Sequence, residues 1–121
     1  MNDERPPIWI GHVLAPYRNL DDSVGFWTKL GLRPVERNDH VAIFELRGGT
    51  HLILVPGAAD RETEASFDLM VEVLDEEHER LTRIGLRPTA IDRNDNHRWF
   101  AVTDPGGNQV TFNDSHVIGV V

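Results

Sequence analysis

The spacing of apolar residues along the chain changes between a helical period and the alternation typical of strands. This order of helical and alternating segments occurs twice. A spacing of four and three residues joins Leu20, Val24, Trp27 and Leu30, which places them on one face of a helix. Alternating apolar segments before and after this stretch predict strands. The strands expected in this half are Ile8–Ala15, Arg33–Arg37, Val41–Leu46 and His51–Val55.

The second half of the chain repeats this order, and short sequence matches support the repeat. TKLGLRP at 28–34 matches TRIGLRP at 82–88. A second helix is expected on the stripe from Leu74 to Ile84, with strands at Phe67–Val73, Thr89–Asp92, Arg98–Thr103 and Gln109–Asn113. We therefore predict one domain over residues 1–121, with module one at about 8–55, a linker at 56–65 and module two at about 66–114.

Strand alternation assigns one face of each predicted sheet to the helices and leaves the other face open. Trp9, Val13 and Ala15 are expected beneath the first helix, whereas His12 points to the open side. The same alternation places a mixed set there: His51, Ile53, Asp68, Met70, His97, Trp99, Gln109 and Thr111. If the sheet curls, these residues line a cup, which is typical of small-molecule binding. A solvated outer face shows the same alternation, so the pattern alone leaves both interpretations open.

Composition narrows the chemistry that such a site can use. Acidic residues number 20 against 12 basic ones, and the formal net charge is −8. Nucleic-acid binding requires a basic surface, so we expect no nucleic-acid partner. The absence of cysteine excludes disulfides, thiolate metal sites and a cysteine nucleophile. No apolar segment approaches the roughly 20 residues that span a bilayer. The first residues also lack the apolar core of a signal peptide, so we expect a cytoplasmic protein without membrane contact.

Two segments carry a resemblance to a known family. GHVLAPYRNLDDSVGFWTKLGL at 11–32 is similar to the opening strand and helix of the vicinal oxygen chelate superfamily, and WFAVTDPGGNQVTF at 99–112 is similar to its closing hairpin. The superfamily includes glyoxalase I, bleomycin- and fosfomycin-resistance proteins and extradiol dioxygenases. The resemblance implies an α+β fold in which two βαβββ modules form a curved eight-stranded mixed sheet, an open cup with the helices on its outer face. It also implies a small-molecule ligand in the cup and a homodimer.

Metal-using members of this superfamily place one ligand on each of four strands, and one of these positions is a clear match here. His12 matches the first position, whereas Ile53 and Thr111 stand where the family usually has glutamate. The remaining position falls at Ser66 or Asp68. We therefore expect no cofactor, and a protein that sequesters a small molecule as bleomycin-resistance proteins do. The net charge of −8 favours a cationic or neutral guest.

An alternative interpretation keeps a metal by means of a substitute ligand set. His12, His51 and Asp68, with His97 as the alternative to His51, would offer two imidazoles and one carboxylate to a divalent ion such as Zn, Ni, Fe or Mn. Glu72 would then be the candidate general base, provided that it is buried. The protein would in that case be a metal-dependent lyase, isomerase or dioxygenase of the glyoxalase type. A third interpretation, a module that only dimerises, requires a cup filled by side chains.

Overall fold

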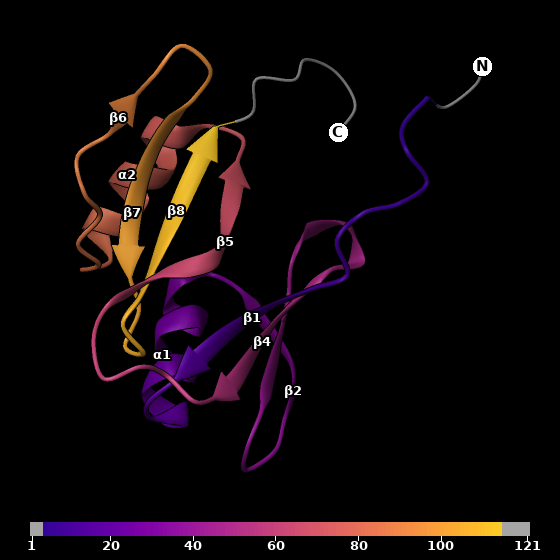
Figure 1. Cartoon of the computed structure of the whole chain (residues 1–121). Helices are drawn as coiled ribbons and strands as arrows, with labels where there is room; N and C mark the ends of the chain where they lie inside the picture. The colour runs from indigo at the N-terminus through magenta and orange to yellow at the C-terminus, as the bar shows by residue number, and fades with distance from the viewer. Residues whose placement is uncertain (1–3, 115–121) are drawn as a thin grey trace.

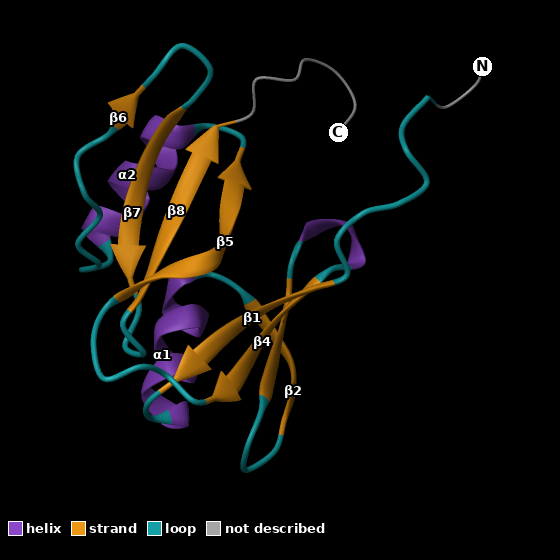
Figure 2. Cartoon of the chain, viewed as in Figure 1, coloured by secondary structure: helices purple, strands orange, loops and turns teal. Residues whose placement is uncertain are grey.

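A computed structural model describes residues 4–114 (Figures 1 and 2). In that part of the chain, strands and helices follow one another in two rounds of β-α-β-β-β. The first round consists of β1 (His12–Tyr17), α1 (Leu20–Leu30), β2 (Arg33–Arg37), β3 (Ala42–Glu45), the short 3-10 helix η1 (Arg47–Gly49) and β4 (His51–Pro56). The second round consists of β5 (Thr63–Val71), α2 (Leu74–Arg83), β6 (Asp92–Arg93), β7 (Arg98–Thr103) and β8 (Asn108–Asp114).

The two rounds build two sheets of the same topology. Sheet A has the strand order β1-β4-β3-β2, and sheet B has the order β5-β8-β7-β6. In each sheet the first strand of the module runs parallel to the last, and the remaining pairs are antiparallel. The predicted α+β fold of two βαβββ modules is therefore confirmed. The eight strands form two separate four-stranded sheets within one chain rather than one continuous sheet. Figure 2 shows the strands of the two modules as two distinct groups.

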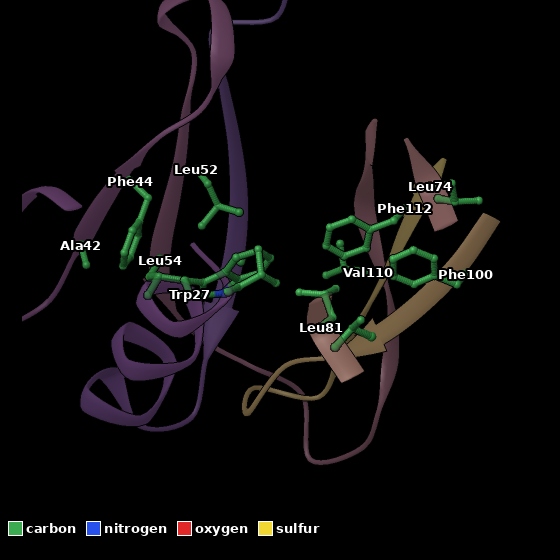
Figure 3. Close-up of a cluster of buried hydrophobic side chains, with 13 residues drawn as sticks. Trp27, Ala42, Phe44, Leu52, Leu54, Leu74, Leu81, Phe100, Val110 and Phe112 are labelled. Atoms are coloured by element: carbon green, nitrogen blue, oxygen red, sulfur yellow. The ribbon is translucent and has the colours of Figure 1, made fainter. Parts of the chain in front are cut away.

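The helix-covered faces of both sheets share one hydrophobic core (Figure 3). Trp27 of α1 and Leu81 of α2 are fully buried in it, together with side chains from the inner faces of β3, β4, β7 and β8. The C-terminal parts of the two helices are also in contact: Nη2 of Arg80 in α2 donates a hydrogen bond to the carbonyl of Leu30 in α1 at 2.6 Å. Since the helix-covered faces turn inward to this core, the open faces of the two sheets turn outward to solvent.

Local sequence signals explain where α1 begins and ends. The Asn19 side chain accepts a hydrogen bond from the backbone N–H of Asp22 at 3.0 Å, as expected of an N-cap residue. Gly31 ends the helix with a φ of 122°, which side chains disfavour. Between these ends, Trp27 and Leu30 are buried, in agreement with the predicted apolar stripe.

The turn between β7 and β8 attaches module two to module one. Asn108 is 5% exposed, and its Nδ2 donates to the Asp104 carboxylate at 2.9 and 3.0 Å. The same Nδ2 donates at 2.7 Å to the carbonyl of Pro16, which belongs to β1. A Cβ atom added to Gly106 would lie 2.4 Å from that carbonyl oxygen, so the close approach requires glycine. Composition predicts a turn here, but it gives no sign of this contact between the modules.

The first strand is displaced from its predicted position. It begins at His12 rather than Ile8, and Trp9, expected beneath the first helix, is 70% exposed. The reason lies in the neighbouring strand. His12 pairs with His51, the first residue of β4, so residues before His12 extend beyond the end of the strand that could hold them.

The predicted strand Thr89–Asp92 is also wrong, because the structure has only Asp92–Arg93 as a strand there. Thr89 still pairs with β7, donating its backbone N–H to the Ala101 carbonyl at 2.9 Å. Its hydroxyl then accepts the Ala101 N–H at 2.8 Å, where a regular ladder would use a backbone carbonyl. This side-chain substitution interrupts the ladder before β6 begins.

Candidate functional site

The open face of sheet A carries a polar row of side chains that crosses all four strands. His12 of β1 lies opposite His51 of β4, and Glu45 of β3 and Arg33 of β2 continue the row. The two imidazole rings have centroids 5.7 Å apart and planes inclined by 34°. Arg33 and Glu45 form an ion pair at the far end of the row. The predicted proximity of His12 and His51 is therefore present in the structure.

A second, apolar row lies beside the polar one. Leu14 of β1 is opposite Ile53 of β4, which is in turn opposite Ile43 of β3. Leu14 is 48% exposed, and both isoleucines are half-buried. Sheet A thus offers a solvent-accessible surface that combines imidazoles with aliphatic side chains.

The open face of sheet B has a different character. One row across it consists of Met70, Asn113, Trp99 and Asp92 from β5, β8, β7 and β6 respectively. Met70 is 59% exposed and Trp99 is half-buried. This row places a thioether and an indole beside a carboxylate, a combination that suits a flat or cationic molecule.

Further rows on sheet B add carboxylates. Asp68 lies opposite Thr111, and Glu64 lies opposite Gln109. Asp68, Glu64 and Gln109 are exposed, and the Gln109 amide donates a hydrogen bond to Glu62 at 3.3 Å. The predicted residues Asp68, Met70, Trp99, Gln109 and Thr111 therefore share one face, while His12, His51 and Ile53 share another.

Two of the predicted site residues lie apart from these rows. His97 precedes β7, and its backbone N–H donates to the Asn94 side chain at 2.9 Å, which places it in the β6–β7 turn. Glu72 follows β5 and forms an ion pair with Arg47 of η1, with 73% of the Glu72 side chain exposed. A general base needs a less solvated position, so Glu72 does not meet the condition set for that role.

Arg98 forms an electrostatic cluster that sequence reasoning did not find. Its Nη2 lies 2.7 Å from Asp75 Oδ2 at the start of α2, and its Nε lies 3.3 Å from Asp114 Oδ2 at the end of β8. The side-chain hydrogen bond from Arg98 lowers the pKa of Asp75, and the backbone hydrogen bond from Arg98 N–H lowers the pKa of Asp114. The cluster connects three elements of module two and lies outside the open rows. No sequence spacing marks it, because its members are 16 and 23 residues from Arg98.

The structure does not bring together, within one chain, the three metal ligands that the sequence predicted. His12 and His51 lie on sheet A, whereas Asp68 lies on sheet B. Among residues 4–114 there is no group of three His, Asp or Glu side chains close enough to hold a metal ion. Ile53 and Thr111 also cannot supply the carboxylates of the family's metal site. The residues present therefore do not fit that four-ligand site.

A cleft of about 300 Å³ lies between the two modules. It is lined chiefly by apolar side chains near the C-terminal end of α1 and along β5, and also by Glu77 and Arg80 of α2. Met70 is the predicted site residue that borders it. In the described part of the chain, neither helix is long and apolar enough to cross a membrane.

Two βαβββ modules, each with the open face of its sheet turned to solvent, define the class of this protein. Comparison with known families supports the same classification. The chain belongs to the Glyoxalase/Bleomycin resistance protein/Dioxygenase superfamily, whose family model matches residues 9–112. This confirms the resemblance that the sequence suggested. No protein among curated sequences matches the chain.

Solved structures show the same fold. A lactoylglutathione lyase from Agrobacterium tumefaciens has a TM-score of 0.79 at 18% identity, covering 96% of this chain and 100% of the other. A bleomycin resistance determinant encoded on the transposon Tn5 has a TM-score of 0.72 at 18% identity, covering 91% and 100%. A bleomycin-binding protein complexed with bleomycin has a TM-score of 0.68 at 17% identity, covering 92% and 100%. At these identities the likeness concerns the fold.

Proposed function

We propose that this protein binds a small, cationic organic molecule on the open sheet faces and releases it unchanged. The observation that carries the proposal is the make-up of those faces. They present aliphatic, aromatic and carboxylate side chains to solvent, and Ile53 and Thr111 occupy the positions of the family's usual carboxylate ligands. Binding by apolar contact with a few polar groups needs no metal. Two of the structural relatives are a bleomycin resistance determinant and a bleomycin-binding protein, which supports sequestration as the activity.

Sheet B is the face that would select for positive charge. Asp68, Glu64 and Asp92 lie on its open side, and the paired rows that contain them hold no arginine or lysine. Trp99 lies opposite Asp92 and offers an indole face for stacking or for cation–π contact. A planar cation would therefore find both an aromatic surface and nearby carboxylates.

Calorimetric titration with bleomycin tests this proposal. We expect saturable binding that Asp68→Asn and Trp99→Leu each weaken by about tenfold, because a charged or stacked contact contributes about 1.4 kcal/mol or more. Asp39→Asn is the matched control, since it removes one negative charge from the exposed β2–β3 turn. Mass spectrometry after incubation should recover the guest intact. A chemically altered guest, or equal weakening by the Asp68 and Asp39 variants, would contradict the proposal.

Two copies of the chain would together enclose the guest. Three consecutive large apolar side chains, Ile8, Trp9 and Ile10, are 83%, 70% and 68% exposed. Leu14 and Met70, on the edge strands β1 and β5, are also exposed. Exposed apolar side chains of this size, on an edge strand or directly before one, are typical of surfaces that a partner covers. In the proposed homodimer, module one of one copy would face module two of the other.

Sedimentation equilibrium tests the dimer separately from ligand binding. Trp9→Glu should shift the protein to monomer, because the charge would have to be buried in the interface. Val35→Glu is the matched control, since Val35 is 53% exposed on β2, at the opposite edge of sheet A. A monomeric parent protein, or equal effects of the two substitutions, would contradict this assembly.

A further inference from the structure

His12 and His51 form a close pair for which packing gives no reason. They begin adjacent parallel strands and occupy opposite positions in the register, so both side chains leave the sheet on its open side. His12 is exposed and His51 is half-buried, with ring centroids 5.7 Å apart. Neither ring lies in the hydrophobic core, in contrast to the partly buried His78, which packs edge-on against Phe100.

The spacing of the two rings suits a shared metal ion. An imidazole nitrogen binds zinc-like ions at about 2.0–2.1 Å, which puts the ring centroid about 3.2 Å from the ion. Two rings on one ion therefore have centroids about 5.2 Å apart at a tetrahedral angle and at most about 6.4 Å apart. The observed 5.7 Å lies between these limits, so the separation of the two rings fits one shared ion.

The neighbours of the pair determine how the rest of the coordination shell is filled. Glu45 is next to His51 in the polar row, but its carboxylate is paired with Arg33. No third His, Asp or Glu completes a metal-binding group within residues 4–114. Leu14 and Ile53, one row away, cannot bind an ion. Two or more coordination positions would therefore be open to water or to donor atoms of a guest.

We propose that His12 and His51 form a two-histidine site for a borderline divalent cation on the open face of sheet A. Imidazole ligands suit Cu²⁺, Ni²⁺ and Zn²⁺, and affinity in this series is greatest for Cu²⁺. The site differs from the set predicted from sequence, because Asp68 on the other sheet takes no part. It uses neither Asp68 nor Trp99, the two residues substituted in the guest-binding test, so the two proposals can fail separately.

Titration with NiCl₂, and with CuCl₂ followed by electron paramagnetic resonance, tests the site in the 121-residue protein. The variants are His12→Ala, His51→Ala and the double substitution. His40→Ala is the matched control, because His40 is an exposed histidine in the β2–β3 turn. The double variant also measures the background metal binding by the amino terminus and the other histidines.

We expect the parent protein to bind one more equivalent of metal than the double variant. Each single substitution should weaken Ni²⁺ binding by about tenfold or more, because loss of either imidazole removes the chelate. The Cu²⁺ spectrum of that extra equivalent should show two equatorial nitrogen ligands, and His40→Ala should change neither result. Circular dichroism establishes that the variants are folded. Equal stoichiometry in the parent and double variant, or an effect of only one of the two histidines, would overturn the proposal.

Discussion

Asn108 offers the sharpest test of how the two modules are held together. Substitution by alanine removes the hydrogen bonds from Nδ2 to the Pro16 carbonyl and to the Asp104 carboxylate, and leaves both acceptors without that donor. A neutral hydrogen bond contributes about 0.5–1.5 kcal/mol, and one to a charged group contributes about 1.5–3 kcal/mol. Asp104 is 4% exposed, so water cannot readily replace the lost donor. We therefore expect Asn108→Ala to lower the free energy of unfolding by about 2–4 kcal/mol.

Urea denaturation followed by circular dichroism measures this loss. With a slope of about 2 kcal/mol/M, the midpoint should fall by about 1–2 M while the slope stays unchanged. Asn94→Ala is the matched control, because the Asn94 side chain accepts two local hydrogen bonds within the exposed β6–β7 turn. That variant should lose less than about 1 kcal/mol. Equal losses in the two variants, or a loss below about 0.5 kcal/mol for Asn108→Ala, would refute the reasoning.

Four further substitutions test other parts of the fold. Gly106→Ala should lower the free energy of unfolding by about 1–3 kcal/mol, because the added Cβ would overlap the Pro16 carbonyl. Gly25→Ala in α1 adds a Cβ that meets nothing within 4 Å, and it should raise the free energy of unfolding by about 0.5–1 kcal/mol. Thermal denaturation compares the two variants. Ser23→Ala removes a fully buried hydroxyl that has no hydrogen-bond partner in the described structure, so chemical denaturation should show equal or higher stability, and a clear loss would contradict this. Arg98 lowers the pKa of Asp75 and Asp114, so its contribution is present at neutral pH and is lost as pH falls from about 4 through the lowered values. Arg98→Gln keeps the backbone N–H that donates to Asp114 but loses the side-chain hydrogen bonds to Asp75 and Asp114. It should therefore be less stable than the parent at pH 7 and approach it as the pH falls well below 4, and a constant difference between neutral and acid pH would show that the carboxylates are not responsible.

Much of the fold could be predicted because the repeated elements carry strong local signals. The stripe through Trp27 and Leu30, the Asn19 cap and the terminal Gly31 all act within one helix, and each is visible in a short stretch of sequence. The displaced first strand shows where this reasoning stops. Whether Trp9 belongs to a strand depends on where β4 begins, and that boundary is set 42 residues later by the pairing of His51 with Gly11 and His12.

The sequence could predict which residues of the candidate site lie on an open sheet face, but it could not predict which of them lie close together. Strand alternation correctly placed His12 and His51 on one face and Asp68 and Trp99 on an open face. It could not establish that these are faces of two different sheets, because alternation is a property of a single strand. The division of the strands into two sheets depends on how the modules pack.

The sequence by itself determined the repeated order of the elements and the family, and it placed side chains such as His12 and Trp99 on open faces, because each of these follows from local periodicity and short motifs. The tertiary structure decided which of those side chains meet. It brought His12 to His51, separated both from Asp68, and joined Asn108 to Pro16 across the modules. The physical reason is that both helix-covered faces bury their apolar side chains in one shared core, which turns the open faces of a single chain outward.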